Sequence, residues 1–242
     1  MKPENDYFLP ENYIARQERT TVEHASNKTY WTQGRLKTSH FYQFPVYEYA
    51  LKIIHKHNIR IMADIGCGPA AKMPFIHKNC PELEIYGVDQ KSAINFCKNN
   101  YDFGHWYVDD FEAPSENVPD FEADLVISAD VIEHLLDPDK LLSYIEKKMR
   151  KDGLVILSTP DRDRLYGKDT LVSGHPDHVR EWNREEFAAY LESRGFKILE
   201  HFFALPLKPS LNKPFIRQSL RQIIKGCHLK YNQVCLLQKS NS

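Results

Sequence analysis

The sequence lacks long hydrophobic runs and paired cysteines. No apolar stretch approaches the roughly 18 residues that a membrane span requires, so we expect no membrane span. The five cysteines are an odd number without any CxxC spacing, which argues against a disulfide framework or a zinc knuckle. The polar, acidic N-terminal stretch has no signal-peptide core. Together these absences favour a reduced, cytoplasmic setting.

A marked excess of charge of either sign is also lacking. The formal net charge is −1, so no global basic field draws the chain to nucleic acid or to an anionic membrane. Internal repeats and low-complexity segments are absent as well. The 242 residues, 42% hydrophobic and 27% charged, suit one sizeable globular core. Nothing in the composition indicates an oligomeric state.

Apolar runs alternate with helical patterns from about residue 46 onward. The helical pattern over 137–150 begins with a capping Asp137 and Pro138, and that over 183–194 begins with a capping box of Asn183 and Glu186. Alternation of buried strands and helices implies a parallel, doubly wound α/β sheet. The predicted strands are residues 59–65, 83–88, 106–108, 124–128, 154–158, 196–205 and 233–237.

We interpret the whole chain, residues 1–242, as a single domain with three parts. Residues 1–45 are polar and tyrosine-rich, and we expect a cap over the edge of the sheet that becomes ordered with ligand. Residues 46–205 form the expected core. Residues 206–242 add a basic helix and the final strand. The stripe Arg217, Arg221 and Lys225 is expected to be a solvated helix face, with reception of a phosphorylated substrate as the alternative.

A glycine-rich turn, Asp64-Ile65-Gly66-Cys67-Gly68-Pro69, follows the first strand. Glycines let the backbone approach a ligand closely, and ligands of such sheets lie at the carboxyl ends of the strands. Asp89, just past the second strand, can accept hydrogen bonds from a ribose diol. The full GxGxxG pattern is absent because Ala71 replaces its last glycine. The short, proline-terminated loop disfavours the alternative of a nicotinamide-dependent oxidoreductase.

Five ordered motifs, ADIGCGP, YGVDQ, VDDFE, DLVISADVIEHLLDP and LVILSTPDR, span about residues 59–205. They resemble the motifs of class I S-adenosylmethionine-dependent methyltransferases. The resemblance implies S-adenosylmethionine as cofactor and a Rossmann-like, seven-stranded sheet, mostly parallel with an antiparallel last strand. It implies that Asp64, Gly66 and Gly68 hold the methionine part, Asp89 the ribose, and Asp110 with Phe111 the adenine, with Gln90 and Ser128 as further cofactor contacts.

The segment Asp130-Val131-Ile132-Glu133-His134 concentrates two acids and a histidine after the fourth strand. On a helix the three polar residues would share one face. A capping box of Asp130 and Glu133, which needs no metal, is the alternative.

A second stretch, GHPDHVREWNREEF at 174–187, favours metal binding over the capping box. Both stretches together resemble the metal-dependent small-RNA 3′-terminal 2′-O-methyltransferases, and the first also resembles metal-dependent quinone O-methyltransferases. The resemblance implies Asp130, Glu133, His134 and His178 as metal ligands and His175 as a substitute fourth ligand. Glu133, His175 and His178 are the candidate catalytic residues. Carboxylates and imidazoles with open positions suit Mg²⁺, Mn²⁺ or Fe²⁺.

The function expected from these features is metal-assisted methylation of an oxygen in a small sugar, nucleotide-linked or phosphorylated acceptor. A loose resemblance to methyltransferases of surface-glycan biosynthesis agrees with this. RNA 3′-end methylation is the first alternative, and the neutral net charge weighs against a nucleic-acid partner. Metal-independent N-methylation is the second, because a neutral amine already carries a free lone pair. A regulatory protein without turnover is a third.

Overall fold

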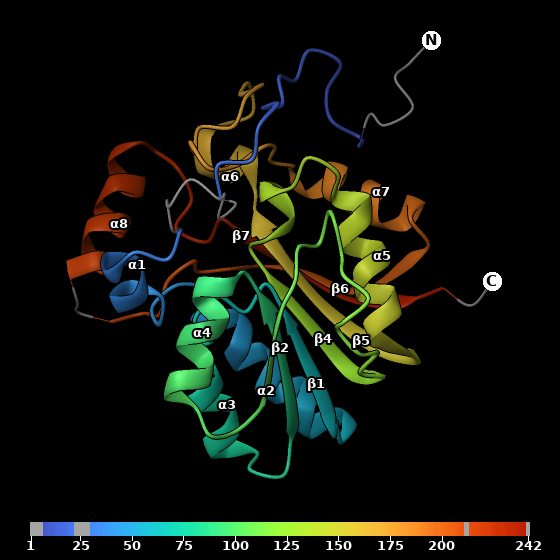
Figure 1. Cartoon of the computed structure of the whole chain (residues 1–242). Coiled ribbons are helices and arrows are strands. Elements are labelled where there is room, and N and C mark those ends of the chain that lie inside the picture. The colour runs from blue at the N-terminus through green and yellow to red at the C-terminus, as the bar shows by residue number, and fades with distance from the viewer. Residues whose placement is uncertain (1–6, 22–29, 211–212, 241–242) are drawn as a thin grey trace.

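The computed structural model describes residues 7–21, 30–210 and 213–240. A seven-stranded sheet with the order β3-β2-β1-β4-β5-β7-β6 forms its centre (Figure 1). Neighbouring strands from β3 to β5 are parallel, whereas β7 is antiparallel to both β5 and β6. The predicted α/β sheet of seven strands with one antiparallel strand is therefore confirmed. The strands are β1 (Ile61–Ile65), β2 (Glu84–Asp89), β3 (His105–Val108), β4 (Ala123–Ala129), β5 (Met149–Pro160), β6 (Phe196–Ala204) and β7 (Asn232–Lys239).

Helices cover both faces of this sheet (Figure 1). One buried cluster packs residues of α2, α3 and α4 against the sheet, and a second packs residues of α5 and α7 against the opposite face. The helices are α1 (Gln33–Thr38), α2 (Phe44–His57), α3 (Met73–Asn79), α4 (Lys91–Asn100), the 3-10 helix η1 (Ile132–His134), α5 (Pro138–Lys148), α6 (Arg162–Tyr166), α7 (Arg184–Ser193) and α8 (Lys213–Ile224). Within the described residues, no helix combines the length and apolar character needed to cross a bilayer.

Burial on both faces explains why the central strands are apolar throughout. In β4, Leu125 and Ile127 join the cluster beneath α2 to α4, and Val126 between them joins the cluster beneath α5 and α7. Successive side chains of a strand point to opposite faces, so a strand covered on both sides needs apolar residues at every position. Such strands end at the first polar residues of the sequence. The polar site residues therefore lie at the carboxyl ends of the strands.

The helix starts follow local capping chemistry. Asp137 accepts a hydrogen bond from the Asp139 N–H at the start of α5, and Asn183 and Glu186 form the predicted capping box of α7. The caps satisfy backbone N–H groups that would otherwise lack a partner. Both helices therefore begin at the predicted residues.

Two elements differ from their predictions. β5 is much longer than residues 154–158, since Met149 already pairs with Ala123 of β4. After Ser128, where a helix would have placed Asp130, Glu133 and His134 on one face, the chain forms only the three-residue η1, and Asp130 adopts a left-handed conformation with φ 54°. The predicted cap at 1–45 lies partly outside the described residues, at 1–6 and 22–29.

Candidate functional site

Three of the four predicted metal ligands converge at the carboxyl edge of the sheet. Glu133 and His134 come from η1, and His178 comes from the loop before α7. One ligand atom of each side chain lies within 4.8 Å of the others. Glu133 is fully buried, and His178 is nearly so. A segment of η1 and a loop more than 40 residues away thus form one donor group.

The two imidazoles are held by outer hydrogen bonds through the same ring atom. Nδ1 of His134 lies 2.7 Å from the carbonyl oxygen of Asp177, and Nδ1 of His178 lies 2.5 Å from Oε1 of Glu181. A carbonyl oxygen can only accept, so Nδ1 of His134 carries the hydrogen. The same assignment at His178 leaves the Nε2 lone pair of each ring available to a ligand. Metal-binding histidines are commonly oriented in this way.

Burial dominates the electrostatics of the group. It raises the pKa of Glu133 well above its ordinary range, to which the nearby Asp130 adds, and lowers the pKa of His134 and of His178 to about 3. Burial also raises the pKa of Glu181 to about 7, so at neutral pH His178 and Glu181 are not a charged ion pair. Without a cation, the imidazoles are neutral.

One carboxylate oxygen of this group has no hydrogen-bond partner. Oε2 of Glu133 accepts a hydrogen bond from the Thr159 hydroxyl at 3.0 Å, whereas buried Oε1 has no partner among the described residues. Buried polar atoms are almost always paired, so an unpaired carboxylate oxygen beside two imidazoles is the kind of donor set that binds a cation.

Backbone and guanidinium contacts fix the loop to η1. The N–H groups of Val179 and Arg180 donate to the carbonyl of Glu133, at 2.8 and 3.3 Å. The buried guanidinium of Arg180 donates to the carbonyls of Leu135 and Leu136, at 3.0 and 2.8 Å. The position of His178 relative to Glu133 is therefore set by several hydrogen bonds besides its own.

Asp130 is not part of the convergent group. Its carboxylate accepts hydrogen bonds from the Ser158 hydroxyl at 2.7 Å and from the Gln43 amide at 3.0 Å. The alternative capping box is not formed either, because Val131 is the N-cap of η1 and no side chain caps it. Metal binding by Asp130 stays a prediction.

His175 lies beside the group rather than within it. Its ring stacks on that of His178 with centroids 4.1 Å apart, and its Nδ1 accepts a hydrogen bond from the Asp177 N–H at 3.2 Å. The role of His175 as a substitute ligand or catalytic residue stays a prediction.

The two predicted cofactor glycines both require backbone that other residues rarely adopt. Gly66 has φ 85° and Gly68 has φ 55°. A Cβ on Gly66 would lie 2.3 Å from the Val131 side chain, and one on Gly68 would lie 2.6 Å from the ring of Trp31. Conformation and space both exclude a side chain here. The turn therefore depends on glycine at both positions.

Two fully buried polar side chains stand at the ends of the neighbouring strands. Asp64 of β1 accepts a hydrogen bond from the Tyr47 hydroxyl at 2.9 Å, and burial raises its pKa to about 7. Its Oδ1 and the Ser128 hydroxyl have no hydrogen-bond partner among the described residues. Both fit a polar ligand at this edge, as predicted for the methionine part of the cofactor.

Asp89 links the second strand to the glycine turn. Its carboxylate accepts hydrogen bonds from the N–H of Gly68 at 2.8 Å and from the N–H of Gln90 at 2.7 Å. The Gln90 side-chain amide donates to the carbonyl of Thr21 at 2.7 Å. The predicted ribose residue is thereby held against the turn.

The predicted adenine residues have unequal surroundings. Asp110 pairs with Arg19 at 2.9 Å and keeps 40% of its side chain exposed. Phe111 is buried and packs on Tyr144, with ring centroids 5.3 Å apart. Phe111 therefore belongs to the core, and its contact with adenine stays a prediction.

Local sequence patterns did not reveal several neighbours of these residues. Arg19 bridges Asp110 and Glu112 from the N-terminal segment, and Trp31 covers Gly68. Neither belongs to a recognisable pattern. Glu181 lies in the stretch 174–187, but no role for it followed from the sequence. Its spacing of three residues from His178 could have indicated the contact between the two side chains.

Comparison with known proteins shows the family of this chain. A family model described as a methyltransferase domain matches residues 46–201. A probable S-adenosylmethionine-dependent methyltransferase from Mycobacterium tuberculosis is 29% identical over 141 residues, which cover 57% of this chain and 48% of that protein. A ubiquinone biosynthesis O-methyltransferase from Bradyrhizobium diazoefficiens is 26% identical over 149 residues, which cover 57% and 58% of the two chains. The chain thus spans about half the length of these relatives.

Solved structures show the same fold. The complex of the Haloferax volcanii Trm112 methyltransferase activator with a methyltransferase contains a chain that aligns with a TM-score of 0.63 and 11% identity, over 87% of this chain and 93% of that one. The methyltransferase domain of bacterial CtHen1-C aligns with a TM-score of 0.56 and 19% identity, over 82% and 98%. The methyltransferase domain model matches more than half of the chain, and the chain therefore belongs to the methyltransferase domain family.

Proposed function

We propose that this chain transfers the methyl group of S-adenosylmethionine to an oxygen of a small polar acceptor with the help of a divalent cation. The observation that carries the proposal is the convergence of Glu133, His134 and His178, with both Nδ1 atoms already engaged. Neutral imidazoles beside a carboxylate oxygen without a partner supply donors that lack a positive charge.

The donor set narrows the choice of cation. Two imidazoles and one carboxylate suit Mn²⁺ or Fe²⁺ better than Mg²⁺, which prefers oxygen ligands. A bound cation would lower the pKa of an acceptor hydroxyl and orient it. Glu133, His134 and His178 would hold it, with Asp130 or His175 as further ligands.

Besides binding the cation, the protein has to align the methyl donor with the acceptor. The sulfonium of the cofactor is already activated, so the rate depends on holding donor and acceptor in line. In this proposal Asp64, Gly66 and Gly68 hold the methionine part and Asp89 the ribose. Asp177 and Glu181 keep the imidazoles in their ligand-ready tautomer through Nδ1.

Two features support an oxygen acceptor of polar character. The relative from Bradyrhizobium diazoefficiens is named as an O-methyltransferase. Polar groups surround the histidines: Arg16 donates to the carbonyl of His178 at 3.1 Å, and Arg35 pairs with Asp177 at 2.9 Å. These arginines suit an acceptor that carries oxygens or negative charge.

The test combines metal binding with turnover. We would measure Mn²⁺ and Fe²⁺ binding by calorimetry for the wild type, Glu133→Gln and His178→Ala, with Glu185→Gln as a control at an exposed residue. S-adenosylhomocysteine release would then be followed with nucleotide sugars, catechols and a short RNA, before and after chelation. We expect the site variants and chelation to abolish binding and turnover. Full activity after complete chelation would contradict the metal role, and activity on RNA alone would favour the 3′-end alternative.

A further inference from the structure

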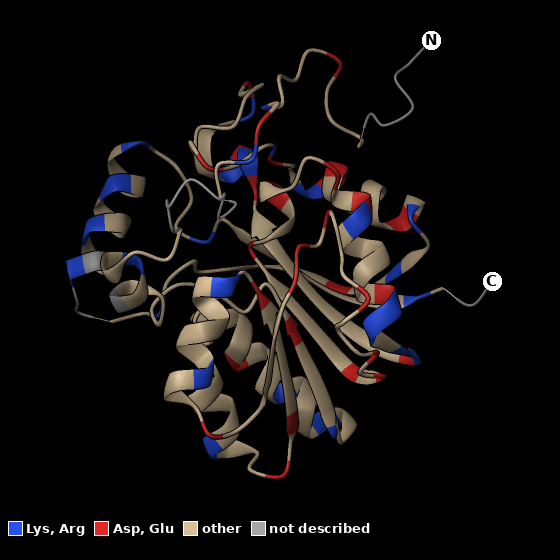
Figure 2. Ribbon diagram, viewed as in Figure 1, with Lys and Arg blue, Asp and Glu red and all other residues tan. Residues whose placement is uncertain are grey.

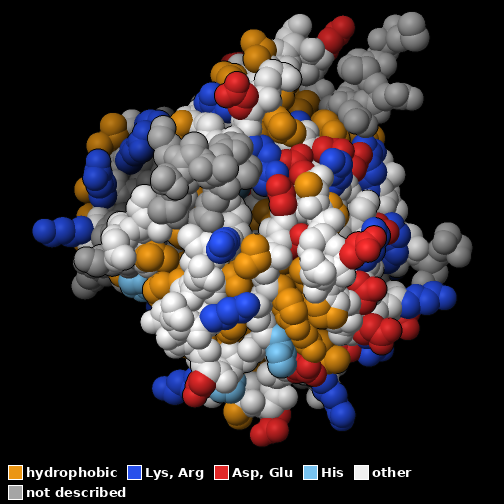
Figure 3. Space-filling view, viewed as in Figure 1, with side chains coloured by type: hydrophobic (Ala, Val, Ile, Leu, Met, Phe, Trp, Pro, Cys, Tyr) orange, Lys and Arg blue, Asp and Glu red, His pale blue; other side chains and the backbone are white. Residues whose placement is uncertain are grey.

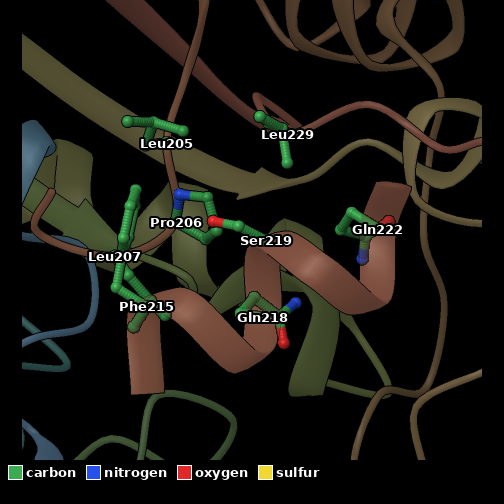
Figure 4. Close-up of a pocket in the computed structure, with 8 residues that line it drawn as sticks. All are labelled: Leu205, Pro206, Leu207, Phe215, Gln218, Ser219, Gln222 and Leu229. Atoms are coloured by element: carbon green, nitrogen blue, oxygen red, sulfur yellow. The ribbon is translucent and has the colours of Figure 1, made fainter. Parts of the chain in front are cut away.

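Helix α8 is packed with its polar side inward. Gln218, Ser219 and Gln222 lie on the inner side, where with Phe215 they line a small cavity beneath Leu207 and neighbouring residues (Figure 4). Gln222 is buried, and the Gln218 amide donates to the Tyr231 hydroxyl at 2.8 Å. A surface helix normally buries its apolar face, so this arrangement is reversed.

The apolar residues of α8 are correspondingly exposed. Ile216, Leu220, Ile223 and Ile224 keep 42%, 53%, 61% and 83% of their surface accessible. Their spacing of four, seven and eight residues from the first places them on one stripe of the helix. Exposed stripes of this kind mark interaction surfaces.

The charges beside the stripe are all positive. Residues 201–242 contain seven Lys and Arg and no Asp or Glu, which the near-neutral charge of the whole chain conceals. Lys213, Arg217, Arg221 and Lys225 border the apolar residues on one open surface. Figure 2 shows only basic charge on α8, and Figure 3 shows basic and hydrophobic side chains side by side where the helix lies.

We propose that α8 docks the protein on a bilayer that contains anionic lipids. A helix with an apolar stripe and a basic flank lies in the interface plane, with its aliphatic side chains among the acyl chains and its cations at the headgroups. Each Lys or Arg near such a surface strengthens binding electrostatically. The reversed packing of α8 gives both groups to the same outer surface.

The charges and side-chain types favour a bilayer over two other occupants. In a second copy facing through the same stripe, the basic rows of the two helices would approach each other and repel. The phosphates of a nucleic acid could bind the Lys and Arg side chains. The four aliphatic side chains, however, would contact neither the phosphates nor the bases favourably, because stacking on bases requires aromatic rings. A bilayer matches both features.

The segment that follows α8 is hydrogen-bonded to α6, the helix that follows β5. Arg164 Nε donates to the carbonyl of Lys230 at 2.6 Å, and the His228 N–H donates to the carbonyl of Arg164 at 3.1 Å. Arg164 belongs to α6, directly after β5 and Asp161. Docking through α8 would therefore hold the carboxyl end of β5 in a defined relation to the bilayer.

The experiment is flotation of the full chain with large unilamellar vesicles. We expect the protein to float with vesicles of phosphatidylcholine and phosphatidylglycerol (3:1) in low salt, and to bind at least about tenfold more weakly to phosphatidylcholine alone or in high salt. Leu220→Glu with Ile224→Glu, and separately Arg217→Glu with Arg221→Glu, should each weaken binding about tenfold or more.

Matched controls separate the proposal from loss of folding. Lys147→Glu reverses one charge at an exposed residue of α5, as each of the two arginine substitutions does on α8, and should leave flotation unchanged. Circular dichroism should show equal helix content in all variants. The proposal is overturned if phosphatidylglycerol vesicles do not bind the wild type, or if the α8 variants float as well as the control. A dimer that Leu220→Glu dissociates, seen by light scattering without lipid, would assign the stripe to a second copy and overturn it as well.

Discussion

The Nδ1 atom of His178 lies 2.5 Å from Oε1 of Glu181, a fully buried carboxylate three residues farther along the chain. Because this contact sets which ring nitrogen faces the convergent group, it gives a test of the site that spares the ligands themselves. Removing such an outer partner typically lowers metal affinity about 10- to 100-fold.

We expect Glu181→Ala to weaken Mn²⁺ binding by about that factor while cofactor affinity is unchanged. Glu181→Gln retains an acceptor oxygen and should recover part of the loss. Calorimetric titration with Mn²⁺, and separately with S-adenosylhomocysteine, measures both effects, and the exposed Glu185→Gln serves as control. Equal Mn²⁺ affinity in wild type and Glu181→Ala would remove Glu181 from the site.

Two glycines provide a matched pair for the cofactor turn. Gly68 and Gly167 both have positive φ, but a Cβ on Gly68 meets the Trp31 ring, whereas one on Gly167 meets nothing within 4 Å. Gly68→Ala should therefore reduce S-adenosylhomocysteine affinity at least about tenfold, in addition to a backbone strain of about 1–3 kcal/mol that a side chain causes at either position. Gly167→Ala should keep full affinity. A similar affinity in the two variants would argue against close approach of the cofactor to this turn.

Arg19 should hold the N-terminal segment at the predicted adenine site. It pairs with Asp110 at 2.9 Å and with Glu112 at 2.8 Å, and only 14% of its side chain is exposed. We expect Arg19→Ala to raise the dissociation rate of S-adenosylhomocysteine about tenfold, since it removes two partly buried ion pairs. Stopped-flow fluorescence measures the rate, with the exposed Lys52→Ala as control. An unchanged rate would show that the segment does not retain the cofactor.

Asp124 makes stability depend on pH in the acid range. Burial opposes its ionisation, but hydrogen bonds from the N–H groups of Arg60 and Ile61 and from Arg150 outweigh it and lower the pKa. A lowered folded-state pKa contributes stability above the unfolded-state value, near pH 4, and loses it as the pH falls through the folded value. Asp124→Asn should cost about 1–2 kcal/mol at pH 7 and little at pH 3. Denaturant unfolding at several pH values tests this, and a difference that persists at pH 3 would contradict it.

Most of the sheet could be predicted because its signals are local. Apolar runs such as 124–128 and caps such as Asn183 depend on neighbours a few residues away. The early part of β5 was not predicted because Arg150, Lys151 and Asp152 are charged, and the long-range pairing of Met149 with Ala123 of β4 sets where the strand begins. The site was predictable in part for the same reason. Periodicity cannot bring His178 to Glu133, and the resemblance of two motifs supplied that contact.

The contacts that sequence reasoning missed are all long-range. Arg19 reaches Asp110 across 91 residues, and Trp31 lies on Gly68 from a stretch with weak periodicity. Asp130 has a left-handed backbone, which keeps it off a helix face shared with Glu133 and His134. No neighbouring residue in the sequence indicates this conformation. Tertiary packing decides such positions, so they lie beyond the reach of local patterns.

The insertion of β7 between β5 and β6 has a consequence for synthesis. The ribosome synthesises β5 and β6 before β7, the strand that pairs with both. While α8 is being synthesised, β5 and β6 therefore each have one edge with unpaired backbone groups. Open edges invite pairing with other chains. Translation speed and chaperone access over residues 205–239 should therefore govern the yield of native protein more strongly than they do over β1 to β4.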